Sequence, residues 1–265
     1  MSSSKFDLII AGIISDSPSC EIREVYNDLI AIAGENAKES ILEAIEQYNI
    51  DNTIPIEVDG EPTIVSKYNK EGSKFFDPVR SKLFSVDPLN RVGLDIESSE
   101  AKLNSTQEKI YQDLKEYTSN DFSGDVVYAV YPVNGEDSKT AIFITSTKYN
   151  PSNFWNGTWR SQYIYDSSSN SLEGSIDVKV HYYEEGNVSF KSNKEIYLLG
   201  VSAVTESLRE VENAFENELD VSFEELNEKQ FRDLRRRLPI TRSKVNWGKS
   251  IGVYRLGKDA AQSGL

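Results

Sequence analysis

Apolar residues recur at helical spacing through the first fifty residues of the chain. They fall at positions i, i+3, i+4, i+7 and i+8, which predicts three short amphipathic helices over residues 4–49. Gly34 is expected to end the second helix, and Asn36 with Glu39 has the spacing of a capping box that would open the third. Short connections between such helices favour an antiparallel three-helix bundle. The apolar positions are Phe6, Ile9, Ile10, Ile13, Ile14, Ile22, Val25, Tyr26, Leu29, Ile32, Ala33, Ile41, Leu42, Ile45 and Tyr48.

Residues 50–100 lose this helical period. Four prolines alternate there with short β-rich pieces such as TIVSKY and SKLFSV, which indicates turns and small strands. A helical pattern returns over residues 104–118, where Ile110, Leu114 and Tyr117 fall on one side.

Alternation with a period of two dominates from Ser123 to about Val201. Asn134-Gly135 separates two such runs, and this dipeptide accepts the positive φ angles of a type I′ turn, so we expect a hairpin. Further aromatic-rich runs continue the meander to about five antiparallel strands. Such a sheet has two edges, and an exposed edge is a template for pairing with another chain. Two interpretations therefore remain possible. A partner subunit pairs with one edge, or the chain itself covers that edge.

The pattern becomes helical again over residues 204–237. Ser222 with Glu225 has a second capping-box spacing, and Pro239 ends the run. We therefore expect an α+β fold. Its segments are a helical stalk (1–50), a turn-rich part with small strands and one helix (51–120), an antiparallel sheet (121–203), C-terminal helices (204–238) and a basic amphipathic tail (239–265).

Charge divides the chain into two unequal parts. The 34 residues from Arg232 onward hold nine Lys or Arg against two Asp, a net charge of +7, whereas the whole chain carries −14, which leaves −21 for residues 1–231. A basic tail on an acidic body suits capture of an acidic protein surface, an anionic lipid or a nucleic acid by long-range attraction. A solvated charge run is the plainer alternative. The basic positions are Arg232, Arg235, Arg236, Arg237, Arg242, Lys244, Lys249, Arg255 and Lys258.

The tail also carries apolar residues among its charges. On a helix, Trp247, Ile251 and Tyr254 lie at i, i+4 and i+7 and form a narrow stripe, with Leu256 close by. Three glycines interrupt the stripe, and each costs about 0.8–1 kcal/mol relative to alanine, so the helix is marginal alone. We expect either a mobile element that becomes ordered in a partner's groove or a segment that folds back on its own body.

Composition fits a soluble, somewhat polar protein, with 38% hydrophobic residues and a mean hydropathy of −0.49. The opening MSSSKFD has neither a basic region nor a long apolar core, so we expect no secretory signal and no stable membrane insertion. A single cysteine, Cys20, excludes an internal disulfide and a multi-cysteine zinc site. The cytoplasm is the expected location.

Candidate chemistry is sparse. His181 is the only histidine and lies within a strand pattern with no nucleophile or carboxylate marked by the sequence, so we interpret it as structural. Cys20 has no adjacent basic group and fits a small core residue better than an activated thiolate. Gly248-Lys249-Ser250 mimics the end of a phosphate-binding loop but lacks the preceding glycine and strand. With no EF-hand spacing either, we expect no cofactor, no metal and no enzymatic activity.

Several strings resemble the α subunits of the heterodimeric F-actin capping protein, CapZ, and they follow the family's order along nearly the whole chain. They are YNIDNTIPI (48–56), KFFDPVRSKLFSVD (74–87), NFWNGTWRS (153–161), VHYYEEGNV (180–188) and LRRRLPITRSKVNW (234–247).

This resemblance implies the architecture and the activity of the family. It implies an obligate heterodimer with a β subunit, a three-helix stalk, sheets joined edge to edge, a long C-terminal helix over the sheet and a mobile C-terminal tail. It also implies calcium-independent capping of the barbed end of actin filaments, without severing, in the cytoplasmic and cortical actin cytoskeleton.

The resemblance places the actin-binding basic positions on Arg232, Arg236 and Arg242, where phosphoinositides are expected to compete as inhibitors. Together with the basic and apolar pattern of the tail, the expected actin-binding residues are Arg232, Arg235, Arg236, Arg237, Arg242, Lys244, Trp247, Ile251, Tyr254 and Leu256. A phosphoinositide-binding module that uses the same basic patch is the alternative. Nucleic acid is disfavoured because the −21 body would repel phosphates.

Overall fold

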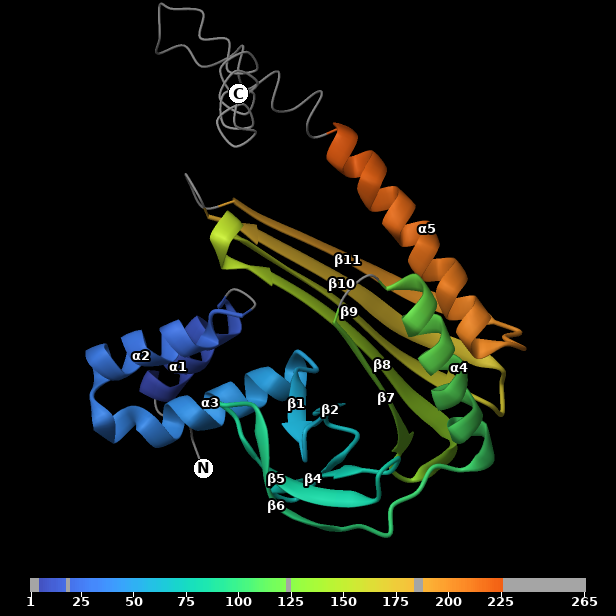
Figure 1. Ribbon diagram of the computed structural model, residues 1–265, viewed down its shortest axis with the longest axis horizontal. Helices are drawn as coiled ribbons and strands as arrows, with labels where there is room; N and C mark the ends of the chain where they lie inside the picture. Colours follow the sequence, from blue (N-terminus) through green and yellow to red (C-terminus); the bar gives the residue numbers. More distant parts are fainter. Residues whose placement is uncertain (1–4, 18–19, 123–124, 184–187, 226–265) are drawn as a thin grey trace, which may run out of the picture. The chain divides into compact units, whose positions relative to one another are not determined.

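The computed structural model describes residues 5–17, 20–122, 125–183 and 188–225 (Figure 1). The chain divides into two compact units, residues 1–211 and 212–265. Within the described residues the α-helices are α1 (Lys5–Ser15), α2 (Ile22–Ala33), α3 (Lys38–Asp51), α4 (Ser105–Asp121) and α5 (Val204–Glu225), and the short 3-10 helices are η1 (Glu35–Ala37) and η2 (Pro151–Asn153). The strands are β1 (Pro55–Val58), β2 (Glu61–Ile64), β3 (Lys70–Glu71), β4 (Lys74–Asp77), β5 (Lys82–Asp87), β6 (Val92–Ser98), β7 (Val126–Val133), β8 (Glu136–Asn150), β9 (Trp155–Asp166), β10 (Ser171–Tyr182) and β11 (Val188–Leu199).

Helices α1, α2 and α3 pack together around one apolar core, as the first fifty residues predicted (Figure 1). Gly34 ends α2 with φ of 81°, and its N–H donates to the carbonyl of Ile30. The predicted capping box at Asn36 is wrong. Because η1 occupies residues 35–37, Asn36 lies inside a turn, and α3 begins after Ala37 without a side-chain cap.

The turn-rich segment forms a sheet of its own, with six short strands in the order β2-β1-β6-β5-β4-β3. All neighbouring pairs are antiparallel except β1 and β6, which meet in parallel at a single residue pair. Phe75 and Phe84 face each other across β4 and β5, with ring centroids 6.2 Å apart, and both are buried. The sequence predicted the small strands, whereas their assembly into one sheet depends on contacts between distant residues.

Residues 126–199 form a five-stranded antiparallel sheet in the order β11-β10-β9-β8-β7, as the alternation predicted. The hairpin at Asn134-Gly135 is present, but the type I′ turn is wrong. That turn needs positive φ at both central residues, and only Gly135, at 79°, has it. The ladder shifts register between Pro132 and Val133, which absorbs the extra residues of β8.

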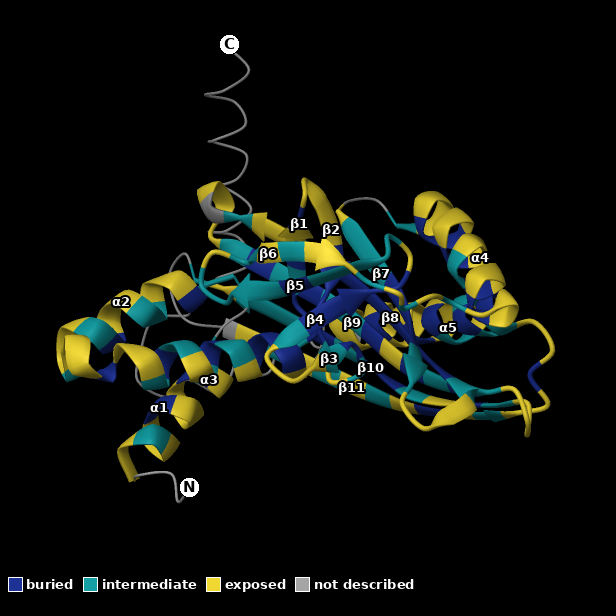
Figure 2. Ribbon diagram, turned by 90° about the horizontal axis from the view of Figure 1, so that it is seen from below, coloured by how far each residue is buried: buried dark blue, intermediate teal, exposed yellow. Residues whose placement is uncertain are grey.

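The two faces of this sheet have different neighbours. Buried residues of β2 and β4 pack on the face that carries Ala129, Tyr131 and Phe143, which we call the β2 face (Figure 2). The Tyr131 hydroxyl donates to the carbonyl of Ile64 at 2.6 Å and fixes β2 there. The other face, which we call the α4 face, carries Tyr128, whose ring lies 5.2 Å from that of Tyr111 in α4.

Helix α4 begins at the predicted place. The Asn104 side chain accepts from the backbone of Gln107, and the Gln107 side chain accepts in return from the Asn104 N–H, so a capping box forms here. Ile110, Leu114 and Tyr117 are all buried, as their spacing predicted.

Helix α5 corrects another prediction. Ser222 does not begin a new helix, because α5 continues through it to Glu225 and its hydroxyl donates to the Glu218 carbonyl at 2.8 Å. Helix interiors accept serine in this way, since the side chain bonds back one turn. The predicted helix over residues 226–238 lies outside the described residues.

Gly174 permits the close contact of β9 and β10. A Cβ atom placed on it would lie 2.2 Å from the Gln162 carbonyl oxygen and 2.6 Å from Cδ1 of Tyr163. Gly157 in β9 is different, since the nearest atom to a Cβ there is 3.9 Å away.

We predict that Gly174→Ala lowers the free energy of unfolding by about 1–3 kcal/mol, because backbone must move to relieve the overlap. Gly157→Ala is the matched control and is expected to change it by less than about 0.5 kcal/mol. Urea-induced unfolding measures both. Equal effects of the two substitutions would contradict the close approach at Gly174.

Candidate subunit interface

The residues that the sequence marked as functional all belong to residues 226–265, outside the described part of the chain. The structure therefore places none of them. They are Arg232, Arg235, Arg236, Arg237, Arg242, Lys244, Trp247, Ile251, Tyr254 and Leu256. The described residues instead show which edge of the five-stranded sheet is open.

The β7 edge is covered by other parts of the same chain. Helix α4 and strand β2 both lie against β7. Thr63 Oγ1 lies 3.3 Å from the Tyr131 hydroxyl, and Val130 and Tyr131 are almost fully buried. These contacts flank β7 on both faces of the sheet, so the β7 edge is the more protected of the two edges.

The β11 edge has no such cover among the described residues. Strand β11 pairs with β10 along its whole length, from Val188–Tyr182 to Leu199–Ser171, and with no strand on its other side. Tyr197 and Leu199 are 67% and 69% exposed, although both are large and partly apolar. A long edge strand with exposed apolar side chains is a template for pairing, and proteins normally protect such edges.

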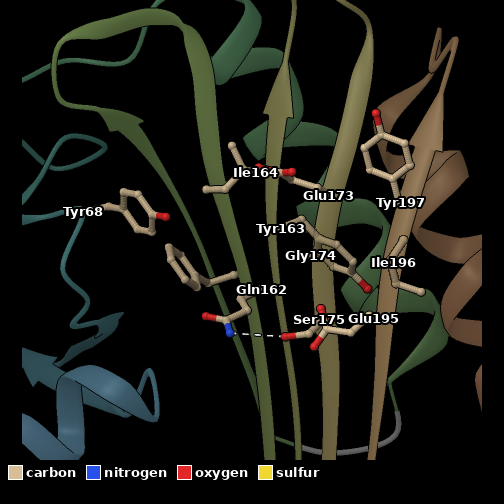
Figure 3. A pocket seen from close by; sticks show the side chains of 11 residues that line it. Tyr68, Gln162, Tyr163, Ile164, Glu173, Gly174, Ser175, Glu195, Ile196 and Tyr197 are labelled. Carbon is tan, nitrogen blue, oxygen red and sulfur yellow. Dashed lines mark hydrogen bonds between the residues drawn. The ribbon is translucent and has the colours of Figure 1, made fainter.

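An open trough of about 520 Å³ lies on the β2 face beside this edge (Figure 3). Tyr68 and Phe143 form its apolar end, with ring centroids 6.0 Å apart. Gln162 donates to the Ser175 hydroxyl at 3.2 Å in its floor. Glu195 and Tyr197 of β11 complete the lining, so the trough is continuous with the open edge.

Charged residues follow one another along this face. Glu173 and Glu195 lie toward one end of the β10–β11 pair, Lys179 and Lys191 face each other toward the other end, and Asp177 lies between them, where it accepts from Asn193. Burial lowers the pKa of Lys179, and the positive charges of Arg160 and Lys191 lower it further, whereas Asp177 and Asp16 raise it. Because like charges gather there, an acidic group brought to Lys191 by another chain would be stabilised.

Glu21 connects the helix bundle to the end of the sheet. It precedes α2 without capping it, and its Oε1 accepts from Asn156 Nδ2 at 3.0 Å and lies 2.9 Å from His181 Nδ1. Asn156 is 1% exposed. The sequence marked no carboxylate partner for His181, and the structure supplies one that lies 160 residues away, which no local pattern indicates. The contact fits the structural role that we predicted for the histidine.

A second polar contact joins α3 to the same face. Arg160 of β9 donates through Nη1 to the carbonyl and the side-chain oxygen of Asn52. Next to it, Thr145 Oγ1 donates to the Thr53 carbonyl at 3.2 Å. These bonds orient the bundle on the sheet that carries the open edge.

Other chemistry is limited in the part of the chain that the structure describes. Burial raises the pKa of the Cys20 thiol, although Arg91 lowers it, which is the opposite of an activated thiolate. No group of three metal-ligating side chains is present among the described residues. Within the same residues, no helix combines the length and apolar character needed to cross a bilayer.

The family model of the F-actin capping protein alpha subunit matches residues 10–259. The F-actin-capping protein subunit alpha of Saccharomyces cerevisiae is 59% identical, over 99% of both chains. That of Eremothecium gossypii is 48% identical over 98% of this chain and 99% of the relative, and that of Neurospora crassa 34% identical over 95% of each. A solved structure, the homodimeric actin capping protein alpha subunit from Plasmodium berghei, has the same fold, with a TM-score of 0.70, 22% identity, and 90% of this chain and 99% of that chain covered.

A mixed α+β chain whose five-stranded sheet leaves the β11 edge unpaired among its described residues has the architecture of a protein that binds another chain. The chain belongs to the F-actin capping protein alpha subunit family. This family consists of structural actin-binding proteins of the cytoskeleton, so the chain is not an enzyme.

Sequence reasoning predicted an open edge but did not identify its strand. In a five-strand meander the first and last strands are the edges, and β7 is the one that α4 and β2 cover. The signal that could have selected β11 is its alternation of charged and aromatic residues, Lys191, Glu195 and Tyr197, on a single face.

We predict that Glu21→Ala lowers the free energy of unfolding by about 1–3 kcal/mol, because it leaves the buried Asn156 amide without its acceptor. Glu24→Ala, an exposed carboxylate in the first turn of the same helix, is the matched control and should change it by less than about 0.5 kcal/mol. Urea unfolding compares them. Similar losses for both variants would show that Glu21 is not an anchor.

Proposed function

We propose that the chain is the α subunit of a heterodimer that caps the barbed end of actin filaments and blocks addition and loss of subunits there. The observation that carries the heterodimer is the open β11 edge, with Tyr197 and Leu199 exposed on it. Family membership along residues 10–259 supports the activity. Capping is calcium-independent and does not sever filaments.

The β subunit pairs with β11 edge to edge and extends the five-stranded sheet. This arrangement supplies partners for the outward N–H and C=O groups of β11 and covers its exposed aromatic and apolar side chains. The trough beside the edge lies within reach of the same partner, since Glu195 and Tyr197 line the trough and also belong to the edge strand β11. The heterodimer is obligate because the chain alone leaves this surface in water.

Residues 232–256 bind the filament end. Arg232, Arg236 and Arg242, with their basic neighbours, attract the acidic surface of the filament end, and Trp247, Ile251, Tyr254 and Leu256 then dock into an apolar cleft. Attraction by exposed charges acts mainly on the association rate, whereas buried apolar anchors act mainly on dissociation. In the proposed architecture the basic amphipathic tail is residues 239–265, and the C-terminal helices of residues 204–238 precede it.

Phosphoinositides compete for Arg232, Arg236 and Arg242 and thereby inhibit capping. A module whose main ligand is phosphoinositide is the alternative function, favoured by the same cluster, because each Lys or Arg near an anionic membrane contributes about 1 kcal/mol. End-specific stoichiometry separates the two functions. The proposed location is the cytoplasm, at cortical actin structures.

The test is barbed-end elongation from pyrene-actin seeds, with this chain co-expressed with a candidate β subunit. Inhibition at nanomolar complex and micromolar actin supports capping, because only an end-binding protein acts so far below stoichiometry. A folded dimer that leaves elongation unchanged, yet binds phosphoinositide vesicles, would favour the alternative.

We predict that Arg232→Glu with Arg236→Glu lowers the association rate of capping at least about ten-fold and changes the dissociation rate much less, since steering charges act before contact. Lys102→Glu with Lys115→Glu is the control, because it makes the same change in net charge on exposed residues of the body. Seeded elongation and dilution-induced depolymerisation give the two rates. Equal changes in both rates would argue against a separate steering role.

Deletion of residues 246–265 is predicted to weaken capping while leaving the heterodimer intact, because the deletion removes the apolar anchors and leaves β11 unchanged. Size-exclusion chromatography with light scattering measures the dimer, and seeded elongation measures capping. If the dimer is lost as well, the segment is part of the assembly interface.

A further inference from the structure

Four neighbouring strands place a row of polar side chains on the β2 face of the five-stranded sheet. The row follows directly paired positions, from Thr147 in β8 through Thr158 in β9 and Lys179 in β10 to Lys191 in β11. Neighbouring strands lie about 4.8 Å apart, so successive side chains of the row lie beside each other. Arg160 is two positions along β9 on the same face, and we call these five residues the donor cluster.

Most side chains of the donor cluster have no partner. Among the described residues, no hydrogen bond or ion pair involves the side chain of Thr147, Thr158, Lys179 or Lys191. Thr158 is only 5% exposed, and its Oγ1 is buried without a partner. Arg160 donates through Nη1 to Asn52, but its Nε is also buried without a partner. Buried donors without a partner destabilise a fold, and a bound water or ion commonly supplies the missing bond.

Three members of the donor cluster are cations, and they repel one another. Lys179 and Lys191 face each other directly across β10 and β11, and like charges in such a pair are destabilising. Burial lowers the pKa of Lys179, and the charges of Arg160 and Lys191 lower it further. The carboxylates of Asp177 and Asp16 act in the opposite direction. The cations outnumber these two carboxylates, so a further negative group is stabilised here.

The nearby carboxylates have other partners or lie too far away to pair with the cluster. Asp177 Oδ1 accepts from Asn193 Nδ2 at 2.9 Å. Glu21 Oε1 lies 2.9 Å from Nδ1 of His181, two positions along β10 from the cluster. Among the described residues, Asp16 forms no ion pair with any of the three cations. None of these groups therefore satisfies the unpaired donors.

The helix bundle encloses the donor cluster on one side, and the β11 edge leaves the other side open. Arg160 is bonded to Asn52 at the end of α3, and Asp16, directly after α1, is close enough to Lys179 to raise its pKa. Lys191, by contrast, is exposed. A flat membrane does not fit between a helix bundle and a sheet, whereas a small dissolved anion can enter past Lys191.

We propose that the donor cluster binds a small phosphate-type anion, free in solution, between the five-stranded sheet and the helix bundle. Lysine and arginine bind phosphate oxygens through charge-assisted hydrogen bonds, and the two threonine hydroxyls donate to the remaining oxygens. The anion connects Arg160, which contacts the bundle, with Lys191 on the edge strand. This site goes beyond the proposed function, because it involves neither actin nor the basic tail.

The first test measures binding of inorganic phosphate by isothermal titration calorimetry at constant ionic strength. It uses the full chain co-expressed with a candidate β subunit. Lys191→Gln is expected to weaken binding at least about ten-fold, because a hydrogen bond to a charged group is lost. Lys191 is exposed, so this substitution leaves the fold intact.

Lys194→Gln is the matched control for this test. It removes the same charge from the opposite face of β11 and is expected to change the affinity less than about two-fold, since solvent and salt screen a charge across the sheet. Equal weakening by both substitutions, or no binding of phosphate to the unmodified complex, would overturn the proposal.

Thr158→Val tests the buried end of the donor cluster. It removes the hydroxyl and is expected to weaken phosphate binding about three- to ten-fold, since one neutral hydrogen bond is lost. Without phosphate, the urea midpoint should stay the same or rise, because the variant no longer buries an unpaired hydroxyl. A lower midpoint without phosphate, with binding unchanged, would show that Thr158 is structural and would remove it from the site.

Two further measurements separate this site from the basic tail and from lipid. Arg232→Glu with Arg236→Glu is expected to leave binding of inorganic phosphate unchanged, and loss of binding would place the anion on the tail instead. Binding to phosphoinositide vesicles is expected to be insensitive to Lys191→Gln. Vesicle binding that falls in this variant, without any binding of inorganic phosphate, would assign the cluster to a lipid headgroup and overturn the free anion.

Discussion

Backbone hydrogen bonding at the sheet edge is the constraint on which this protein depends. Every strand offers N–H and C=O groups on both sides, and an edge strand must satisfy the outer ones with water or with another chain. Here α4 and β2 flank β7, so this edge is the more protected one. The unpaired groups are then concentrated on β11, which is long and carries Tyr197 and Leu199 on its exposed side.

The helix bundle is held to this sheet by polar contacts as well as by packing. Glu21 contacts His181 and Asn156, and Arg160 contacts Asn52, all on the β2 face that carries the trough. Each contact joins residues more than 100 positions apart in the sequence. Burial lowers the pKa of Arg160; its Nη1 donates to Asn52, whereas its buried Nε has no hydrogen-bond partner. Directional bonds of this kind fix an orientation, which apolar packing alone leaves less defined.

Residues 1–231 are acidic and residues 232–265 are basic, so the two parts interact differently with an acidic surface. The acidic body repels other acidic surfaces, while the basic residues after Arg232 attract them, so an encounter is directed to one segment. This attraction acts over a distance and weakens with salt.

The sequence by itself determined the local elements. Period and turn chemistry gave the bundle helices, α4 and the five-stranded meander, and the residues of longer strings identified the family. The sequence failed at Asn36 and Ser222, where a 3-10 turn and a continuing helix replaced the expected caps, because capping spacing is only a local preference. Only the tertiary structure decided that β7 is covered and β11 open, and that His181 meets Glu21. These contacts join residues far apart in the chain, and no periodicity encodes which distant surface a face will meet.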